Sequence, residues 1–283
     1  MTTTPTPSTP PTPYSLLPTS YNQASLQDYA DCPRRFQLGY VEHVDWPAHE
    51  AQPALENERH MQQGAAFHRL MHQHLLGIPE EQLACAATDA DLRRWWHNYL
   101  THGPENLPAS RHPEIVLSAP LGDYRLVAKY DLVTVDPGRR AVILDWKTSR
   151  RRPKRKYLAE RLQTKVYPYL LVLAGDHLNG GQPLAPEQVE MVYWFANFPD
   201  DPARFPYSAA QYKADEAYLT SLVGQIGDPP YPRTSDERNC RYCRYRSLCQ
   251  RGVEAGPLDK MEDELTQDFD ISLDFEQIAE IEY

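Results

Sequence analysis

The stretch that decides the fold is Val142-Ile143-Leu144-Asp145-Trp146-Lys147, an apolar run that ends in an acid and a lysine two residues apart. Side chains alternate between the two faces of a β-strand, so Asp145 and Lys147 should point one way and Trp146 the other. A carboxylate that can bind a divalent metal ion, beside an ammonium group that stabilises developing negative charge, is a minimal pair for phosphodiester cleavage. Because the Asp-x-Lys tripeptide is common, an ordinary strand end with a surface ion pair is the alternative interpretation.

The residues that follow this run are strongly basic. Positions 147 to 165 carry nine lysines and arginines against a single acid, Glu160. A local excess of positive charge of this kind is where a polyanionic backbone would lie. The residues expected to contact the backbone of a nucleic acid are Arg150, Arg151, Arg152, Lys154, Arg155 and Lys156.

The 283 residues are enough for one large domain or for two small ones. The net charge of −10 comes from residues 254–283, whereas the rest of the chain has equal numbers of basic and acidic residues. No stretch approaches the roughly 18 apolar residues that a membrane span needs, and the start of the chain does not have the pattern of a signal peptide. We therefore expect a soluble protein of the cytoplasm.

Composition divides the chain into three parts. Residues 1–20, with six prolines and seven threonines, are expected to form a disordered leader. Residues 21–253 are expected to form the folded domain. The acidic tail, residues 254–283, is expected to be disordered; it is either a solvated segment, a site for a protein partner or a mimic of DNA that covers the basic groove.

Hydrophobic periodicity and turn residues predict the elements of the folded part. A capped helix start is expected near Ser25. Further helices are expected over 64–76, 89–101, 157–174 and 208–226, and strands over 114–118, 124–135, 141–147 and 189–195. The helix over 157–174 should break or kink at Pro168. Helices before and after a β-meander indicate a mixed α/β domain with one central sheet.

Three of the five cysteines form a C-x2-C-x5-C run among arginines: Cys240, Cys243 and Cys249. Disulfides are not expected in a reducing compartment, and closely spaced thiols are typical of a metal or cluster site. Cys32 is the candidate for the missing fourth ligand. Neighbouring arginines should lower the thiol pKa values. An iron–sulfur cluster, zinc and unliganded structural thiols all remain open, and Cys85, in an alanine-rich stretch, is expected to be a buried free thiol.

Polar side chains elsewhere could complete a metal site. Asp131 interrupts an otherwise apolar strand, and a short turn would bring it close to Asp145. The two carboxylates would repel each other, and bound Mg²⁺ or Mn²⁺ would relieve that repulsion. An ion pair of Asp131 with Lys129 or Lys147 is the alternative.

Two predicted helices add further candidates. His68 lies on the helix over 64–76, where a histidine is either a ligand or a packed or exposed side chain. Gln163 and Tyr167 share a helix face just beyond the basic run. They could form a hydrogen bond and stack on a strand of nucleic acid, or they could be ordinary surface residues.

Together these residues resemble the PD-(D/E)XK nucleases of the RecB-like class that carry an iron–sulfur cluster. That class includes the nuclease domain of AddB and the exonucleases of CRISPR adaptation. The resemblance spans roughly residues 23–251 and depends on the order of its motifs. These are Cys32-Pro33-Arg34-Arg35-Phe36, Gly64 to His68, Asp131, Asp145 with Lys147, Gln163 with Tyr167, and the trio Cys240, Cys243 and Cys249. One departure is Ala128, where the family often has glycine; an alanine needs little extra space.

The resemblance implies a fold and a cofactor. The fold would be α/β, with a PD-(D/E)XK restriction-endonuclease-like core, a central mixed sheet flanked by helices, and a cluster that joins the N- and C-terminal segments. A [4Fe-4S] cluster would be held by Cys32, Cys240, Cys243 and Cys249. The cluster would be structural, without redox turnover.

The resemblance also implies an activity. His68, Asp131, Asp145 and the main-chain carbonyl of Trp146 would hold Mg²⁺ or Mn²⁺, and Lys147 would act with Asp131 and Asp145 in catalysis. The chain would be a metal-dependent DNA exonuclease that acts on single-stranded ends in repair, recombination or CRISPR adaptation. The alternative is a catalytically idle nucleic-acid-binding subunit that recruits a partner through its acidic tail.

Overall fold

Eight strands form two sheets in the computed structural model, which describes residues 20–44, 54–227, 230–241 and 243–252. The larger sheet has the order β2-β5-β6-β7-β8, in which β6 and β7 are parallel and the other neighbours antiparallel. Its strands are β2 (Ser110–Pro113), β5 (Leu132–Asp136), β6 (Arg140–Lys147), β7 (Val189–Phe195) and β8 (Phe198–Pro206). The smaller sheet has the order β1-β4-β3. Its strands are β1 (Ser20–Tyr21), β3 (Val116–Leu121) and β4 (Tyr124–Lys129).

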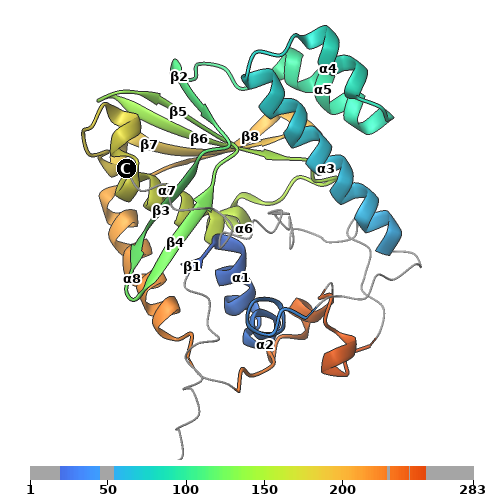
Figure 1. The fold of residues 1–283 in the computed structure, drawn as a ribbon, viewed down its shortest axis with the longest axis vertical. Coiled ribbons are helices and arrows are strands. Elements are labelled where there is room, and N and C mark those ends of the chain that lie inside the picture. Colours follow the sequence, from blue (N-terminus) through green and yellow to red (C-terminus); the bar gives the residue numbers. More distant parts are fainter. Residues whose placement is uncertain (1–19, 45–53, 228–229, 242, 253–283) are drawn as a thin grey trace, which may run out of the picture.

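Helices surround both sheets (Figure 1). Their bounds are α1 (Gln23–Asp31), α2 (Pro33–Phe36), α3 (Ala54–Leu75), α4 (Glu80–Ala86), α5 (Ala90–His102), α6 (Arg155–Glu160), α7 (Leu162–Ala174) and α8 (Ala209–Gly224). Shorter turns are the π-helix η2 (Gln37–Val41) and the 3₁₀ turns η3 (Asp176–Asn179), η4 (Pro186–Gln188), η5 (Glu237–Cys240) and η6 (Ser247–Cys249). No helix within the described ranges is both long and apolar enough to cross a membrane.

Strand β6 separates two hydrophobic cores. Ile143 packs in the larger core, with residues of α7 and β7. Val142, Leu144 and Trp146 pack in the second core, with residues of α3 and α5. Neighbouring side chains of β6 therefore enter opposite cores, as strand alternation requires. This arrangement leaves Asp145 and Lys147 on the face of β6 that α7 covers.

The predicted fold class is confirmed: the domain is α/β, with a central mixed sheet flanked by helices. The prediction of one strand over 124–135 was wrong, because the chain leaves the ladder at Tyr130 and Asp131 and passes from β4 in one sheet to β5 in the other. Asp131 leaves the strand to accept a hydrogen bond from the main chain of Trp146. The expected helix near Ser25 begins at Gln23, and Asn22 rather than Ser25 caps it.

Of the break or kink expected at Pro168, the break was wrong. Pro168 lies inside α7, and the chain breaks instead at Arg161, whose backbone is extended. The helix predicted over 64–76 begins earlier, at Ala54. Ser20, assigned by prediction to the leader, belongs to β1. The rest of the leader and the whole acidic tail lie outside the described residues.

Candidate active site

The predicted acids and lysine meet at the end of β6. Lys147 Nζ lies 2.9 Å from Asp145 Oδ2, and both side chains are buried. Asp131 Oδ2 accepts a hydrogen bond of 2.8 Å from the main-chain N–H of Trp146. Asp131 Oδ1 lies 3.2 Å from Nδ1 of His68, on α3. The structure therefore brings together four residues that are spread over 80 positions of the sequence.

A fifth side chain completes the network. Gln163, the second residue of α7, donates from Nε2 to Asp145 Oδ1 at 2.6 Å. Its Oε1 accepts from Lys147 Nζ at 3.1 Å. Gln163 is 3% exposed, so these two bonds satisfy a buried amide that would otherwise cost free energy. The sequence predicted Gln163 as a contact to nucleic acid, whereas the structure makes it a partner of both Asp145 and Lys147.

The glycine one turn before His68 has a steric role. A Cβ atom at Gly64 would lie 3.1 Å from Oγ1 of Thr148, the residue that follows β6. This is a tight contact, so with a Cβ at position 64 the Thr148 side chain or α3 would have to shift by a few tenths of an ångström. Gly64 thereby allows the close approach that places His68 beside Asp131.

The two carboxylates differ in their electrostatics. The pKa of Asp145 is raised to about 6: burial is the main cause and the nearby Asp131 adds to it, while Lys147 and His68 act in the opposite direction. Burial also acts to raise the pKa of Asp131, but His68 and the hydrogen bond from Trp146 outweigh it, and the net shift is downward. Burial would lower the pKa of His68, but the charge of Asp131 raises it overall. Asp145 is therefore the acid whose ionised form is least well stabilised by the protein alone.

The site has donors that suit a divalent cation. Carboxylate oxygens and main-chain carbonyls are the ligands that Mg²⁺ prefers, and imidazole suits Mn²⁺ and related ions. Asp145 Oδ2 is buried, and Lys147 Nζ lies 2.9 Å from it. Within the described ranges no group of three or more His, Cys, Asp or Glu side chains is arranged to hold a metal ion. Asp131 and Asp145 instead bond to His68, Lys147 and Gln163, and these are the contacts that a cation would replace.

Comparison with known proteins identifies the fold family. A family model described as the PD-(D/E)XK nuclease superfamily matches residues 20–250. The chain belongs to this superfamily. No curated protein matches the sequence. Among solved structures, a candidate exonuclease from Eubacterium rectale is similar, with a TM-score of 0.50 and 10% identity over 79% of this chain and 87% of that one. The protein SSO0001 is 14% identical over 82% of this chain and 85% of that one, with a TM-score of 0.38.

Membership of the PD-(D/E)XK superfamily gives the reaction class. The chain is a nuclease by family, which implies that it binds nucleic acid and hydrolyses phosphodiester bonds. Proteins of this family typically use Mg²⁺ or Mn²⁺. Asp145-Trp146-Lys147, which the sequence predicts to be the family's Asp-x-Lys element, lies at the end of β6.

The side chains of the basic run differ in how far they are exposed. Arg152 pairs with Asp201 of β8 at 3.1 Å, and its guanidinium lies 4.2 Å from the centre of the Phe195 ring. The guanidinium of Arg155 lies 4.4 Å from the Phe205 ring. Arg152 therefore packs on the edge of the sheet. The members of the run that are exposed are Arg150, Arg151, Lys154, Arg155 and Lys156.

Tyr167 does not occupy the position that the sequence suggested. Its side chain is 3% exposed, and its ring centre lies 4.8 Å from that of Tyr130. Its main-chain carbonyl accepts a hydrogen bond of 2.9 Å from the Tyr130 hydroxyl. The ring is part of the larger core and has no exposed face on which a base could stack, so the expected stacking role is not supported.

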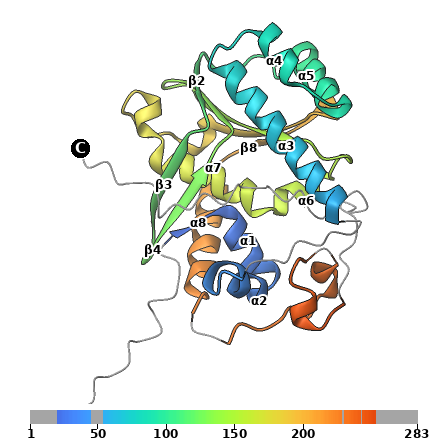
Figure 2. The same cartoon turned by 45° about the vertical axis from the view of Figure 1, so that its right-hand side comes forward.

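Four of the cysteines line one cavity: Cys32, Cys240, Cys243 and Cys249. The segment that contains the last three lies beside α1 and α2 (Figures 1 and 2). Thr234 donates its main-chain N–H to Cys32 Sγ at 3.5 Å, and Arg251 donates to Cys240 Sγ at 2.8 Å. Cys32 therefore lines the same cavity as the trio, although it lies far from them in sequence.

Two predictions about the cysteines were wrong. Burial raises the pKa of Cys243 and Cys249, and it outweighs the opposing effect of nearby arginines such as Arg35. Cys85, expected to be buried, is exposed on α4. The alanine-rich sequence around Cys85 indicated burial, but in α4 only Leu83 is buried.

Proposed function

We propose that this chain is a metal-dependent deoxyribonuclease that works as an exonuclease on single-stranded DNA ends. The observation that carries the proposal is the buried network of Asp145, Lys147 and Gln163 beside Asp131, in a chain of a nuclease superfamily. A buried lysine and two carboxylates are costly for stability, and such groups are concentrated at sites where they have a chemical role.

Each residue of this site has a proposed role. His68, Asp131, Asp145 and the main-chain carbonyl of Trp146 would hold Mg²⁺ or Mn²⁺, which, when bound, lowers the pKa of a water molecule and neutralises charge on the scissile phosphate. Lys147 would orient the attacking water or stabilise the extra negative charge of the transition state. Gln163 would keep Lys147 directed towards Asp145.

The substrate follows from the resemblance and from the exposed basic run. Exposed side chains of the run would contact phosphates and would not distinguish one base sequence from another. They are Arg150, Arg151, Lys154 and Lys156. Exonuclease action on single-stranded ends is taken from the resemblance to the RecB-like class. The solved structure of similar fold from Eubacterium rectale is also described as a candidate exonuclease. Repair, recombination or CRISPR adaptation is the setting that such an activity would serve.

The four cavity cysteines are proposed to bind a [4Fe-4S] cluster. Support comes from the cavity that all four cysteines line. The fold brings Cys32 to this cavity from far away in sequence, as its contact with Thr234 across 202 positions shows. A cluster there would join the N- and C-terminal segments of the domain and stabilise the fold. Iron and sulfide analysis of anaerobically purified protein separates this proposal from a zinc site. A zinc-loaded protein would contain neither iron nor sulfide and would be colourless.

The test of the activity is cleavage of 5′- and 3′-labelled single-stranded DNA with Mg²⁺ or Mn²⁺, using anaerobically purified protein. Lys147→Ala should lower the rate by about 10²–10³-fold. The matched control is Lys213→Ala, which removes an exposed lysine of α8, outside the basic run, and should retain cleavage. The labels also give the polarity. DNA binding without metal-dependent cleavage by the wild-type protein would contradict the proposal and favour an idle binding subunit.

A further inference from the structure

The first turn of α7 is held by a residue from a distant part of the chain. Arg161, at the N-terminal cap position of α7, provides no side-chain hydrogen bond to the helix. The first amide of the helix, Leu162 N–H, instead donates to Gln27 Oε1 of α1 at 3.1 Å, across 135 positions of sequence. Amides of a first helical turn lack partners within the helix, so this side chain satisfies a group that sequence-local residues leave open.

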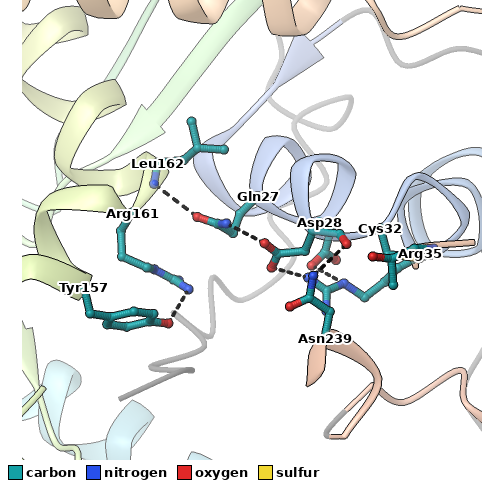
Figure 3. Close-up of polar contacts among 10 residues, drawn as sticks. Gln27, Asp28, Cys32, Arg35, Tyr157, Arg161, Leu162 and Asn239 are labelled. Carbon is teal, nitrogen blue, oxygen red and sulfur yellow. Dashed lines mark hydrogen bonds and ion pairs between the residues drawn. The ribbon is translucent and has the colours of Figure 1, made fainter. Parts of the chain in front are cut away.

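Gln27 is itself fixed by a polar cluster, shown in Figure 3. Its Nε2 donates to Asp31 Oδ1 at 3.0 Å. Asp31 Oδ2 lies 2.8 Å from Arg35 Nη2, and Arg35 Nε lies 2.8 Å from Asp28 Oδ1. Arg35 is 5% exposed. With both ends of its amide bonded, Gln27 has one orientation rather than a choice of rotamers.

The same cluster reaches the cysteine segment. Asn239, the residue before Cys240, donates from Nδ2 to the main-chain carbonyl of Asp31 at 2.9 Å (Figure 3). Arg35 also lines the cysteine cavity. A continuous chain of contacts therefore runs from the cavity through Asp31 and Gln27 to Leu162.

The residue after Leu162 is the one that bonds to the active site. Gln163 contacts Asp145 at 2.6 Å and Lys147 at 3.1 Å, and hydrogen bonds of this kind are lost when an atom moves by a fraction of an ångström beyond their range. Misplacement of a catalytic group by about 1 Å can cost about 10²-fold in rate.

We propose that Gln27 is a positioning residue of the nuclease site: by holding the first amide of α7, it keeps Gln163 in place against Asp145 and Lys147. This inference rests on the proposed function. Gln27 touches neither Asp145 nor Lys147 in the described contacts, so its effect passes through the main chain of α7. It should therefore alter the rate of the chemical step and leave the affinity for DNA unchanged.

The experiment compares Gln27→Ala, Gln27→Glu and Gln211→Ala with the wild-type protein. Gln211 is a matched control, because it donates to Asp215 four residues later, as Gln27 donates to Asp31, without contacting Leu162. Gln27→Ala should lower kcat for labelled single-stranded DNA by about 10–100-fold at unchanged KM. Gln27→Glu keeps an acceptor oxygen for Leu162 N–H but loses the donor to Asp31, whose carboxylate repels it, so it should recover only part of the lost kcat. Hydrogen exchange at the Leu162 amide should become faster in Gln27→Ala alone.

Several results would overturn this role. They are a Gln27→Ala variant with the kcat of Gln211→Ala, a change in KM without a change in kcat, or unchanged exchange at Leu162. Failure of the proposed function gives a different result, because the wild-type protein would then show no metal-dependent cleavage at all.

Discussion

The end of β6 and the cysteine cavity are built in opposite ways. Seven of the eight residues of β6 are buried, and the strand is paired on both sides within the larger sheet. The turns η5 and η6, which contribute Cys240 and Cys249 to the cavity, contain no buried residues. Arginine side chains hold this segment by bonds to main-chain carbonyls, as Arg233 does to Cys249 at 2.7 Å.

The difference separates two sources of order. The sheet and two hydrophobic cores fix the active site before any ligand binds, at the cost of burying charged groups. The cysteine segment has little buried apolar area of its own, so its order should depend on what the thiols bind. We therefore expect substitutions at the end of β6 to lower activity with little effect on stability. Substitutions of the cavity cysteines should lower stability first, and activity only as a consequence.

The largest effect is expected for Asp145→Asn. The rate of cleavage should fall by about 10²–10³-fold, the range typical for loss of one group that stabilises the transition state. The melting temperature should not fall, because burial raises the pKa of Asp145 and the ionised form is already disfavoured in the fold. Calorimetry and the labelled-DNA assay check the two parts. A clear loss of stability would mean that the ion pair with Lys147 outweighs the burial of the charge.

Cys243→Ser should produce the opposite result. The free energy of unfolding should fall by about 3 kcal/mol. For a domain of this size each kcal/mol shifts the melting temperature by about 2–4 °C, so the melting temperature should fall by about 6–12 °C. Solubility should fall with it, and activity should fall only as the folded fraction does. The control is Cys85→Ser, an exposed thiol outside the cavity, which should be neutral. Equal melting temperatures for Cys243→Ser, Cys32→Ala and wild type would contradict a structural role for the cavity.

Acid should weaken cation binding at the end of β6. Because the pKa of Asp145 is raised to about 6, protons compete with the cation below that pH, and Mn²⁺ affinity should fall by about tenfold per pH unit. Protonation of His68, whose pKa is also raised, acts in the same direction. Without metal, protonation of Asp145 should instead make the fold more stable as the pH falls from about 6 towards 3.8. Calorimetric titration with Mn²⁺ between these values tests the first part, and a pH-independent affinity would refute it.

The smallest effect concerns the basic run. The double change Lys154→Ala and Lys156→Ala should weaken DNA binding and reduce the slope of log affinity against log salt by about 1.4, at about 0.7 per phosphate contact on a single strand. The rate at saturating DNA should not change. Lys213→Ala, an exposed lysine on α8, serves as the control for general charge. An unaltered salt slope would place the DNA path elsewhere.

The sequence alone was sufficient for the centre of the sheet. Strand β7 has the predicted bounds, and the alternation along β6 put Asp145 and Lys147 on one face, as observed. Strands β2 and β8 were not predicted, because their sequences are rich in proline and charge. Both are edge strands, where a missing N–H and charged side chains are tolerated.

The remaining differences come from contacts between distant parts of the chain. At the break at Arg161, the first amide of α7 bonds to Gln27, which lies far from it in sequence. Tyr167 shares a helix face with Gln163, but α7 packs among the sheets and other helices, so the face is buried. The sequence indicated Gln163 only through its i, i+4 spacing to Tyr167. Its hydrogen bonds to Asp145 and Lys147 form only in the folded chain, so the sequence could not predict them.

The span of the cysteine cavity also sets an order of events during synthesis. Cys32 and Thr234 are 202 positions apart, so at a translation rate of about 5–20 residues per second the ribosome needs about 10–40 s to pass from one to the other. Strands β2 to β8 are all translated within that interval. The cavity is thus the last part of the described fold that can be completed, and an inorganic group that needs all four thiols can be held there only after the ribosome has passed Cys249.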